Sequence, residues 1–530
     1  MRDVTISRRG LLIGSAGGIA LAARPAWGQR QAPLTPADID TIARGFLDGL
    51  PMAGVAITVV QPGAPDIARG YGVRTLGKPD PVDGHTLFAI ASNSKAFTAA
   101  ALAILVDEGR IGWDQPVVGY LPEFAMYDPA VTQMMTVRDL LVHRSGLGLG
   151  QGDLMLFGGN HSIAEMVHGL RYLKPARGFR AGYAYDNILY LVAGLLIERV
   201  SGQSWADFVT ARLLVPLGMG ETVTVESLST SANIAGRHAR LGPPVRGMGK
   251  LGVVVAQNDP RIGPAGGIMA SAHDIAAWLH AQLAHGETAR GRRLWSEKQA
   301  TEMWQPQVIT TYTDGPTAAD PGRAVMAAYA LGWNVQDYRG HRLISHTGLL
   351  SGQSTAQAML PEQGVAIAIY TNQEERLVTL GLRNALLDRL LGVSGSDWIA
   401  LTQSRLDKQE REALAVIGGG RFEAPPGRLS LPLAAYVGRY RDPWYGDIIV
   451  TQTGQTLSLD MTRTLTGESL LERWGTEAFR THFEGDSEDA VVSFAVKDGR
   501  VAGVTMKALS PLADFSFDYQ DLAFVPVAEG

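Results

Sequence analysis

The order of helical and strand-like segments constrains the fold of this chain more than any other feature of its sequence. Residues from about 92 to 300 have mainly helical periodicity, with apolar side chains recurring three or four positions apart. Strand-like runs lie on both sides of this region, at 54–60, 332–335, 340–344, 356–360 and 365–370. One sheet must therefore be assembled from both ends of a long helical segment. This pattern predicts an α+β domain over residues 33–393 with a mostly helical insertion.

The last quarter of the chain has a different pattern. A helical stretch near residues 397–415 leads into Gly418-Gly419-Gly420 and Ala424-Pro425-Pro426-Gly427, which are flexible and unfavourable to helix. We therefore expect a helical and Gly/Pro linker over 394–432. Residues 433–530 then consist of short alternating segments separated by turns, which predicts an all-β barrel or sandwich domain.

The first 28 residues are typical of a targeting segment. Arg8-Arg9 directly precedes an apolar run over 11–23, and Ala26-Trp27-Gly28 offers small residues for cleavage. The run is too short to span a bilayer, and the paired arginines resemble a twin-arginine export signal. The alternative is an uncleaved N-terminal anchor. We expect a periplasmic or secreted protein without a membrane span in its mature part, because no later run of about 18 apolar residues occurs.

The amino-acid composition excludes several classes of function. The chain has 47 basic and 52 acidic side chains, so it lacks the basic footprint of a nucleic-acid-binding protein. It has no cysteine, which excludes thiolate nucleophiles and Cys-ligated metals. Neither His161 with His168 nor His280 with His285 has the spacing of metal ligands on one helical face. We therefore expect no metal or cofactor; a homo-oligomer is possible.

Ser92 and Lys95 are the first catalytic candidates. They lie three residues apart in a polar cluster that opens an apolar helical stretch, so they share one helical face. A lysine whose ammonium form is disfavoured by burial can take the proton of a serine hydroxyl. The alternative is an N-cap serine beside a solvated lysine. Two counts favour catalysis: Lys95 is the only one of eight lysines with serine three residues before it, and no Gly-x-Ser-x-Gly occurs.

The second and third candidates lie further along the chain. Tyr185 and Asn187 precede an apolar helical stretch; Tyr185 could act as base and acid, and the Asn187 amide could hold a substrate carbonyl or the lysine. The same Tyr-x-Asn spacing recurs at residues 370–372, where it is better interpreted as the end of a strand. His346-Thr347-Gly348-Leu349 lies in a predicted strand, where a glycine permits close approach and the Leu349 N–H could join that of Ser92 in an oxyanion hole. The alternative for His346 is an ordinary core or surface histidine.

These elements, in this order, resemble the penicillin-recognising serine hydrolases: class C β-lactamases, D-aminopeptidases, D-alanyl-D-alanine carboxypeptidases and related esterases. The family's Ser-x-x-Lys falls on Ser92 and Lys95, its Tyr-x-Asn on Tyr185 and Asn187, and its Lys-Thr-Gly on His346-Thr347-Gly348. Supporting stretches lie at 136–147, 264–268 and 329–333. The resemblance covers residues 33–393 and implies a β-lactamase/transpeptidase-like antiparallel sheet flanked by helices. Residues 433–530 resemble the lipocalin-type barrel appended to some peptidases of this group.

The resemblance implies an acyl-enzyme cycle in which Lys95 and Tyr185 deprotonate Ser92; which of them is the base stays open. The chain departs from the family at His346, which replaces a lysine and is mostly neutral at pH 7, so a cation for a substrate carboxylate is largely lost. The resemblance therefore implies an exported peptidase or amidase, and as its partner a small peptide, amide or ester substrate. The alternatives are a carboxylesterase or β-lactamase, and a binding or sensing protein on an inactive scaffold, against which the retention of Ser92, Lys95 and Tyr185 argues.

Overall fold

The computed structural model describes residues 33–225, 229–255, 259–417, 424–465, 467–484 and 487–528. The predicted signal segment 1–28 and Gly418-Gly419-Gly420 lie outside the described residues. Within these ranges, no helix has both the length and the apolar character needed to cross a membrane.

The central sheet has eight strands in the order β2-β1-β12-β11-β10-β9-β8-β7, and every neighbouring pair is antiparallel. The strands are β1 (Gly54–Val60), β2 (Ile67–Gly72), β7 (Val308–Tyr312), β8 (Met326–Tyr329), β9 (Asn334–Tyr338), β10 (His341–Leu350), β11 (Gln353–Leu360) and β12 (Val365–Thr371). Two short ribbons pair β3 (Phe88–Ala89) with β6 (Met269–Ala270) and β4 (Arg237–Arg240) with β5 (Leu251–Val254). Ile57 of β1 pairs with Ile369 of β12, which confirms that one sheet is built from both ends of the helical region.

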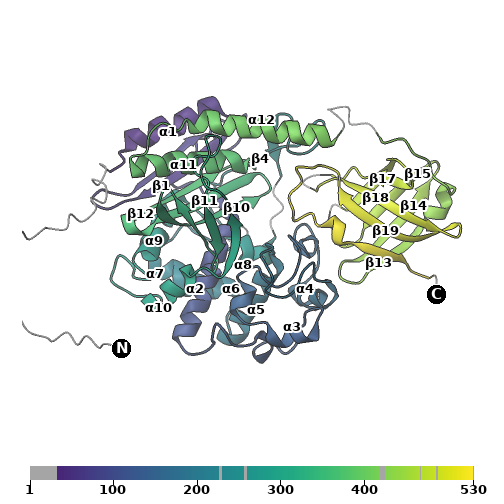
Figure 1. Cartoon of the computed structure of the whole chain (residues 1–530), viewed down its shortest axis with the longest axis horizontal. Coiled ribbons are helices and arrows are strands. Elements are labelled where there is room, and N and C mark those ends of the chain that lie inside the picture. Colours follow the sequence, from purple (N-terminus) through teal and green to yellow (C-terminus); the bar gives the residue numbers. More distant parts are fainter. Residues whose placement is uncertain are drawn as a thin grey trace, which may run out of the picture. The chain divides into compact units, whose positions relative to one another are not determined.

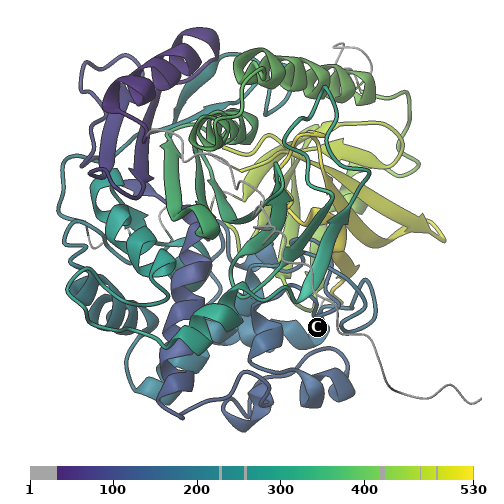
Figure 2. The ribbon, with the colours of Figure 1, turned by 60° about the vertical axis from the view of Figure 1, so that its left-hand side comes forward.

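Helices cover both faces of this sheet, and further helices pack on other helices in the region between β2 and β7. The helices are α1 (Pro36–Gly49), α2 (Ser94–Asp107), α3 (Pro129–Met134), α4 (Ile163–Gly169), α5 (Ile188–Ser201), α6 (Trp205–Val209), α7 (Val215–Leu217), α8 (Gly263–Gly266), α9 (Ala272–Leu283), α10 (Glu297–Trp304), α11 (Arg376–Leu391) and α12 (Trp398–Val416). Helices α3 and α4 are among those that pack on other helices. Alternate residues of β1 point to opposite faces. Val55 and Ile57 join the apolar cluster that contains α1, α11 and α12, whereas Ala56 joins the cluster of α2, α5 and α9. Figures 1 and 2 show α1, α11 and α12 grouped on the same side of the sheet.

Helix α12 lies within the stretch 394–432 that we expected to be a linker. The side chain of Asp397 caps its first turn, and Trp398 donates a hydrogen bond of 2.8 Å from Nε1 to Asp388 of α11. Ile399 packs so closely on α1 that a Cβ on Gly49 would come within 2.8 Å of it. This helix therefore forms part of the layer over the sheet.

The C-terminal segment closes into a barrel in which each strand pairs with the next. Its strands are β13 (Gly438–Asp442), β14 (Gly446–Thr453), β15 (Thr456–Met461), β16 (Glu468–Arg473), β17 (Ala478–Arg480), β18 (Ala490–Lys497), β19 (Arg500–Ala508) and β20 (Ala523–Pro526). Buried Tyr436, Phe479 and Phe494 meet edge-to-face with ring centroids 5.1 to 5.8 Å apart. The predicted α+β domain followed by an all-β barrel is confirmed.

Candidate active site

Ser92 lies in the short turn Ala91–Asn93 between β3 and α2. Ile90, directly before the turn, donates its N–H to the carbonyl of Ile268, directly before β6, at 2.9 Å. Ala91 has φ of +50°, a left-handed conformation that costs free energy in a non-glycine residue and often occurs at functional sites. Asn93, not Ser92, occupies the N-cap of α2. The interpretation of Ser92 as an N-cap serine therefore does not hold.

Lys95 is fully buried, so it is not the solvated lysine of the alternative interpretation. Its Nζ lies 3.0 Å from Ser92 Oγ, 2.6 Å from Asn187 Oδ1 and 2.9 Å from the carbonyl oxygen of Ala265. Burial lowers the pKa of Lys95 to about 7, although the nearby carboxyl groups of Asp153 and Asp186 act in the opposite direction. A lysine in this state can exist as a neutral amine at neutral pH.

Tyr185 approaches Ser92 from the other side. Its hydroxyl donates to Ser92 Oγ at 2.8 Å, and burial raises the pKa of Tyr185 well above its usual range. Tyr185 is therefore a phenol at neutral pH. The ring of buried His143 packs against it with centroids 4.2 Å apart.

Asn187 links the lysine to a buried carboxyl group. Its Oδ1 accepts from Lys95, and its Nδ2 donates to Asp153 Oδ2 at 2.7 Å, so the partners on both sides fix the orientation of the amide. Of the two roles that the sequence left open, Asn187 has the one that holds the lysine. Burial raises the pKa of Asp153 to about 7.

His346 lies on β10 in the same cavity as Ser92, with both ring nitrogens engaged. Nδ1 faces the carbonyl oxygen of Thr347 at 2.6 Å and must donate to it, so Nε2 accepts from the hydroxyl of Tyr329 at 2.8 Å. Burial lowers the pKa of His346 to about 3, and Lys95 adds to the effect. The imidazole is therefore neutral.

Strand β10 runs close to the Ser92 turn. A Cβ on Gly348 would come within 2.4 Å of the Ile90 carbonyl oxygen and 2.8 Å of the Ala91 Cβ. Only a glycine at this position therefore lets β10 pack this closely against the Ser92 turn. Thr347 and Leu349, which flank it, both line the cavity that contains Ser92. The structure thus brings all eight of the predicted site residues to one place.

The barrel domain also contacts the residues around Ser92. Ser516 donates from Oγ to Asp153 Oδ2 at 2.8 Å. Asp518 accepts from the backbone N–H groups of Gly152 and Leu154 at 2.6 and 2.9 Å, which ties the barrel to the loop that carries Asp153. The ring of Phe515 meets that of Tyr185 edge-to-face with centroids 5.6 Å apart. No motif in the sequence marked Asp153, Ser516 or Asp518, and Tyr329 and His143 lay in the supporting stretches without a role.

The site opens into a cavity of about 790 Å³. Ser92, Tyr185 and His346 line it on the side of the α+β domain, which we call the catalytic-site domain, and residues 512–517 of the barrel domain line another wall. A half-buried serine hydroxyl between a lysine and a tyrosine, facing a cavity of this size, can attack the carbonyl group of a small ligand.

Comparison with known families agrees with this geometry. The family model described as Beta-lactamase matches residues 39–390, and a model described as a domain of unknown function, DUF3471, matches residues 423–526. The chain therefore belongs to the Beta-lactamase family. The resemblance drawn from the Ser92, Tyr185 and His346 motifs is confirmed at the level of the family, which is one of hydrolases.

Individual relatives are distant. The chain is 28% identical over 433 residues to an unguisins hydrolase, ungD', of Aspergillus campestris, which covers 78% of this chain and 77% of the relative. It is 28% identical over 307 residues to penicillin-binding protein 4 of Amycolatopsis lactamdurans, covering 57% and 76% of the two chains.

Two solved structures share the fold. The octameric penicillin-binding protein homologue from Pyrococcus abyssi matches with a TM-score of 0.55 and 20% identity over 89% of this chain and 98% of its own. The D-amino acid amidase from Ochrobactrum anthropi SV3 in complex with L-phenylalanine amide matches with a TM-score of 0.53 and 23% identity over 71% and 99%. At these identities the likeness concerns the fold alone.

Proposed function

We propose that this protein is a serine hydrolase that cleaves peptide or amide bonds through an acyl intermediate on Ser92. The observation that carries the proposal is the position of Ser92 Oγ, which lies 3.0 Å from Lys95 Nζ and 2.8 Å from the Tyr185 hydroxyl. A nucleophile in hydrogen-bonding contact with a base and with a proton donor is the arrangement that acyl transfer requires.

Lys95 is the better base of the two groups that the sequence left open. Two of its three contacts, Asn187 Oδ1 and the carbonyl of Ala265, can only accept hydrogen bonds. A neutral amine donates its two N–H groups to these acceptors and keeps its lone pair for the Ser92 hydroxyl. Since burial lowers the pKa of Lys95 to about 7 and raises that of Tyr185, the amine is available at neutral pH and the phenolate is not.

The reaction then proceeds in two balanced halves. Lys95 takes the Ser92 proton as Oγ bonds to the substrate carbonyl carbon; when the C–N bond breaks, Tyr185 gives its proton to the leaving nitrogen and recovers one from Lys95. In the second half, water loses a proton to the same pair and attacks the acyl carbon. The pair returns that proton to Ser92 Oγ as the bond between Oγ and the acyl carbon breaks, which releases the acid and restores the serine hydroxyl. The N–H groups of Ser92 and Leu349 are the donors proposed for the oxyanion.

The neutral state of His346 favours amides and peptides over β-lactams as substrates. A lysine at this position would offer a charge to a carboxylate beside the scissile bond, whereas the buried imidazole is neutral because its pKa is lowered to about 3. Linear peptides and aminoacyl amides need no such carboxylate. Distant relatives that are an unguisins hydrolase and, in fold, a D-amino acid amidase agree with this choice.

A substrate panel tests the proposal. Linear peptides, D- and L-aminoacyl amides, short esters and a chromogenic cephalosporin are assayed with the wild-type protein and with Ser92→Ala. We expect hydrolysis of a peptide or an amide that Ser92→Ala abolishes. Faster turnover of esters or of the cephalosporin than of every peptide and amide would make the protein an esterase or a lactamase instead. The absence of any Ser92-dependent turnover would favour a binding protein.

We also propose that the protein is exported through its twin-arginine segment. The support is the Arg8-Arg9 pair directly before the apolar run over 11–23. Replacing both arginines by lysine keeps the charge and removes the pair, so we expect the precursor to remain unprocessed in the cytoplasm. A lysine variant that is still cleaved and exported would show that the segment is not recognised as a twin-arginine signal.

A further inference from the structure

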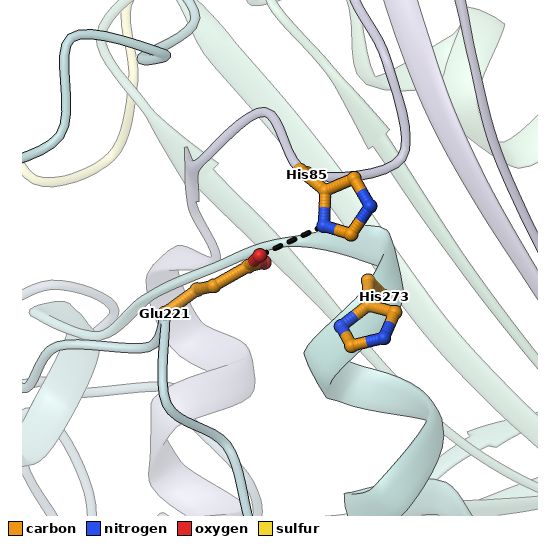
Figure 3. A group of neighbouring side chains, drawn as sticks. All are labelled: His85, Glu221 and His273. Carbon is orange, nitrogen blue, oxygen red and sulfur yellow. Dashed lines mark hydrogen bonds and ion pairs between the residues drawn. The ribbon is translucent and has the colours of Figure 1, made fainter.

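Three side chains from distant parts of the chain meet on the surface of the catalytic-site domain. His85 precedes β3, Glu221 follows α7, and His273 lies in the first turn of α9 (Figure 3). Each can offer one ligand atom, and these atoms all lie within 4.8 Å of one another. His85 and His273 are exposed and Glu221 is half-buried, so small rotations can bring the three atoms to the separations of about 3.3 Å found around a tetrahedral ion.

The hydrogen bonds around the cluster already orient its carboxylate. Glu221 Oε1 accepts from His85 Nδ1 at 2.7 Å, and Glu221 Oε2 accepts from Ser271 Oγ at 2.6 Å. Ser271 is not one of the three possible ligands, and outer partners of this kind fix the direction of ligands in metal sites. Asp274 places a second carboxylate oxygen 3.3 Å from His273 Nδ1.

The local charge favours a cation. Glu221 and Asp274 bring two carboxylates to the cluster, and among the described residues neither forms an ion pair with an arginine or a lysine. Two imidazoles and one or two carboxylates are the donor set that suits borderline divalent ions. We propose that His85, Glu221 and His273 form a binding site for a divalent transition-metal ion such as Zn²⁺, with water completing its coordination.

The position of the cluster gives such an ion a structural consequence. Glu221 lies two residues before Val223, which forms two backbone hydrogen bonds with Met269 of β6, at 3.0 and 2.9 Å. Phe88 of β3 pairs with Ala270 of β6. His85 lies three residues before Phe88 in the chain, and His273 lies three residues after Ala270.

All three ligands therefore lie at one end of the small β3–β6 ribbon. The other end of the ribbon leads into the turn that carries Ser92. The N–H of His273 also donates to the Gly84 carbonyl at 2.8 Å, so the three segments are already in contact. A bound ion would join them and stabilise the folded state, because it binds the native arrangement and not the unfolded chain.

A second histidine–carboxylate pair provides the matched control. His280, further along α9, contacts Asp66 at 2.9 Å and is also exposed, but these two residues have no third ligand beside them in the described part of the chain. If paired surface groups alone captured metal, both places would bind it equally. The proposal requires the third ligand.

The test is Zn²⁺ binding by the whole chain, prepared without a histidine tag and measured by calorimetry and by thermal unfolding. We expect one saturable site, a rise in the midpoint of unfolding with Zn²⁺, and affinity that falls at least about tenfold in His85→Ala and in His273→Ala but not in His280→Ala. Co²⁺ should give the visible absorption bands of a low-symmetry site in the wild type and in His280→Ala only.

Two results would overturn the proposal: no saturable binding by a folded wild-type protein, or binding that survives both His85→Ala and His273→Ala. Since neither the calorimetry nor the spectra depend on turnover, failure here leaves the proposed hydrolase function untouched. Circular dichroism of each variant without metal shows whether the variant is folded. It therefore distinguishes the loss of a metal-binding side chain from the loss of the folded state.

Discussion

Ser516 of the barrel domain and Asp153 of the catalytic-site domain share a hydrogen bond of 2.8 Å from Oγ to Oδ2. Asp153 accepts in turn from Asn187, and Asn187 accepts from Lys95, so three hydrogen bonds connect the barrel to the proposed base. All four side chains in this series are buried. The barrel therefore contributes to the position of the proposed base, even though all of the proposed catalytic side chains precede it in sequence.

The first prediction follows from that connection. Ser516→Ala removes one of the two hydrogen bonds that Asp153 Oδ2 accepts, and we expect kcat/KM to fall roughly three- to tenfold, since a hydrogen bond of this kind contributes about 1 kcal/mol. Ser516→Thr, which keeps the hydroxyl, should recover part of the loss. The matched control is Ser493→Ala on β18, which lies in the same barrel but does not line the cavity. Equal activity in Ser516→Ala and Ser493→Ala would refute the coupling.

The pH dependence of the rate is the second prediction. The lysine must be neutral to accept the Ser92 proton, and its pKa in the folded protein is lowered to about 7. Activity should therefore be present above pH 7 and decline about tenfold for each unit below it. The measurement is kcat/KM against pH with an uncharged amide substrate, with circular dichroism at each pH to confirm folding. A rate that stays constant down to pH 5 is incompatible with Lys95 as the base.

His346 gives the third prediction. His346→Lys places an amine where the wild type has a neutral imidazole, so the ratio of kcat/KM for substrates with a carboxylate near the scissile bond to that for uncharged amides should rise, by about tenfold or more. His346→Gln remains neutral and should leave this ratio unchanged. If the glutamine variant shifts the ratio as much as the lysine variant, shape and not charge determines the preference.

The fold could be predicted from sequence where the chain is buried on both sides. All seven residues of β1 and all seven of β12 are buried, and both strands appear in the sequence as mainly apolar runs, with Thr58 inside the first and Thr371 at the end of the second. Strands β2, β7 and β8 were not predicted, and the structure gives the reason for two of them. Most residues of β2 and β7 are at least partly exposed, at the two edges of the sheet, so neither has a strong apolar pattern.

The candidate site could be predicted from the sequence where its residues lie close together in the chain. Ser92 and Lys95 are three residues apart on one turn, so their contact is visible in the sequence. Asp153 and Ser516 are 363 residues apart, and only the docking of the barrel brings them together. His85, Glu221 and His273 are also far apart in the sequence, and they come together only in the folded catalytic-site domain, so a search for ligands on one helix does not find them.

The identity of the nucleophile is the central claim, and covalent labelling tests it most directly. A fluorophosphonate probe is added to the folded protein, and the modified residue is located by tandem mass spectrometry. We expect a single adduct on Ser92, formed more slowly at pH 5 than at pH 8, and none in a folded Ser92→Ala variant. An adduct on Ser94 or Ser351, or labelling of the wild type that persists in Ser92→Ala, would contradict the account.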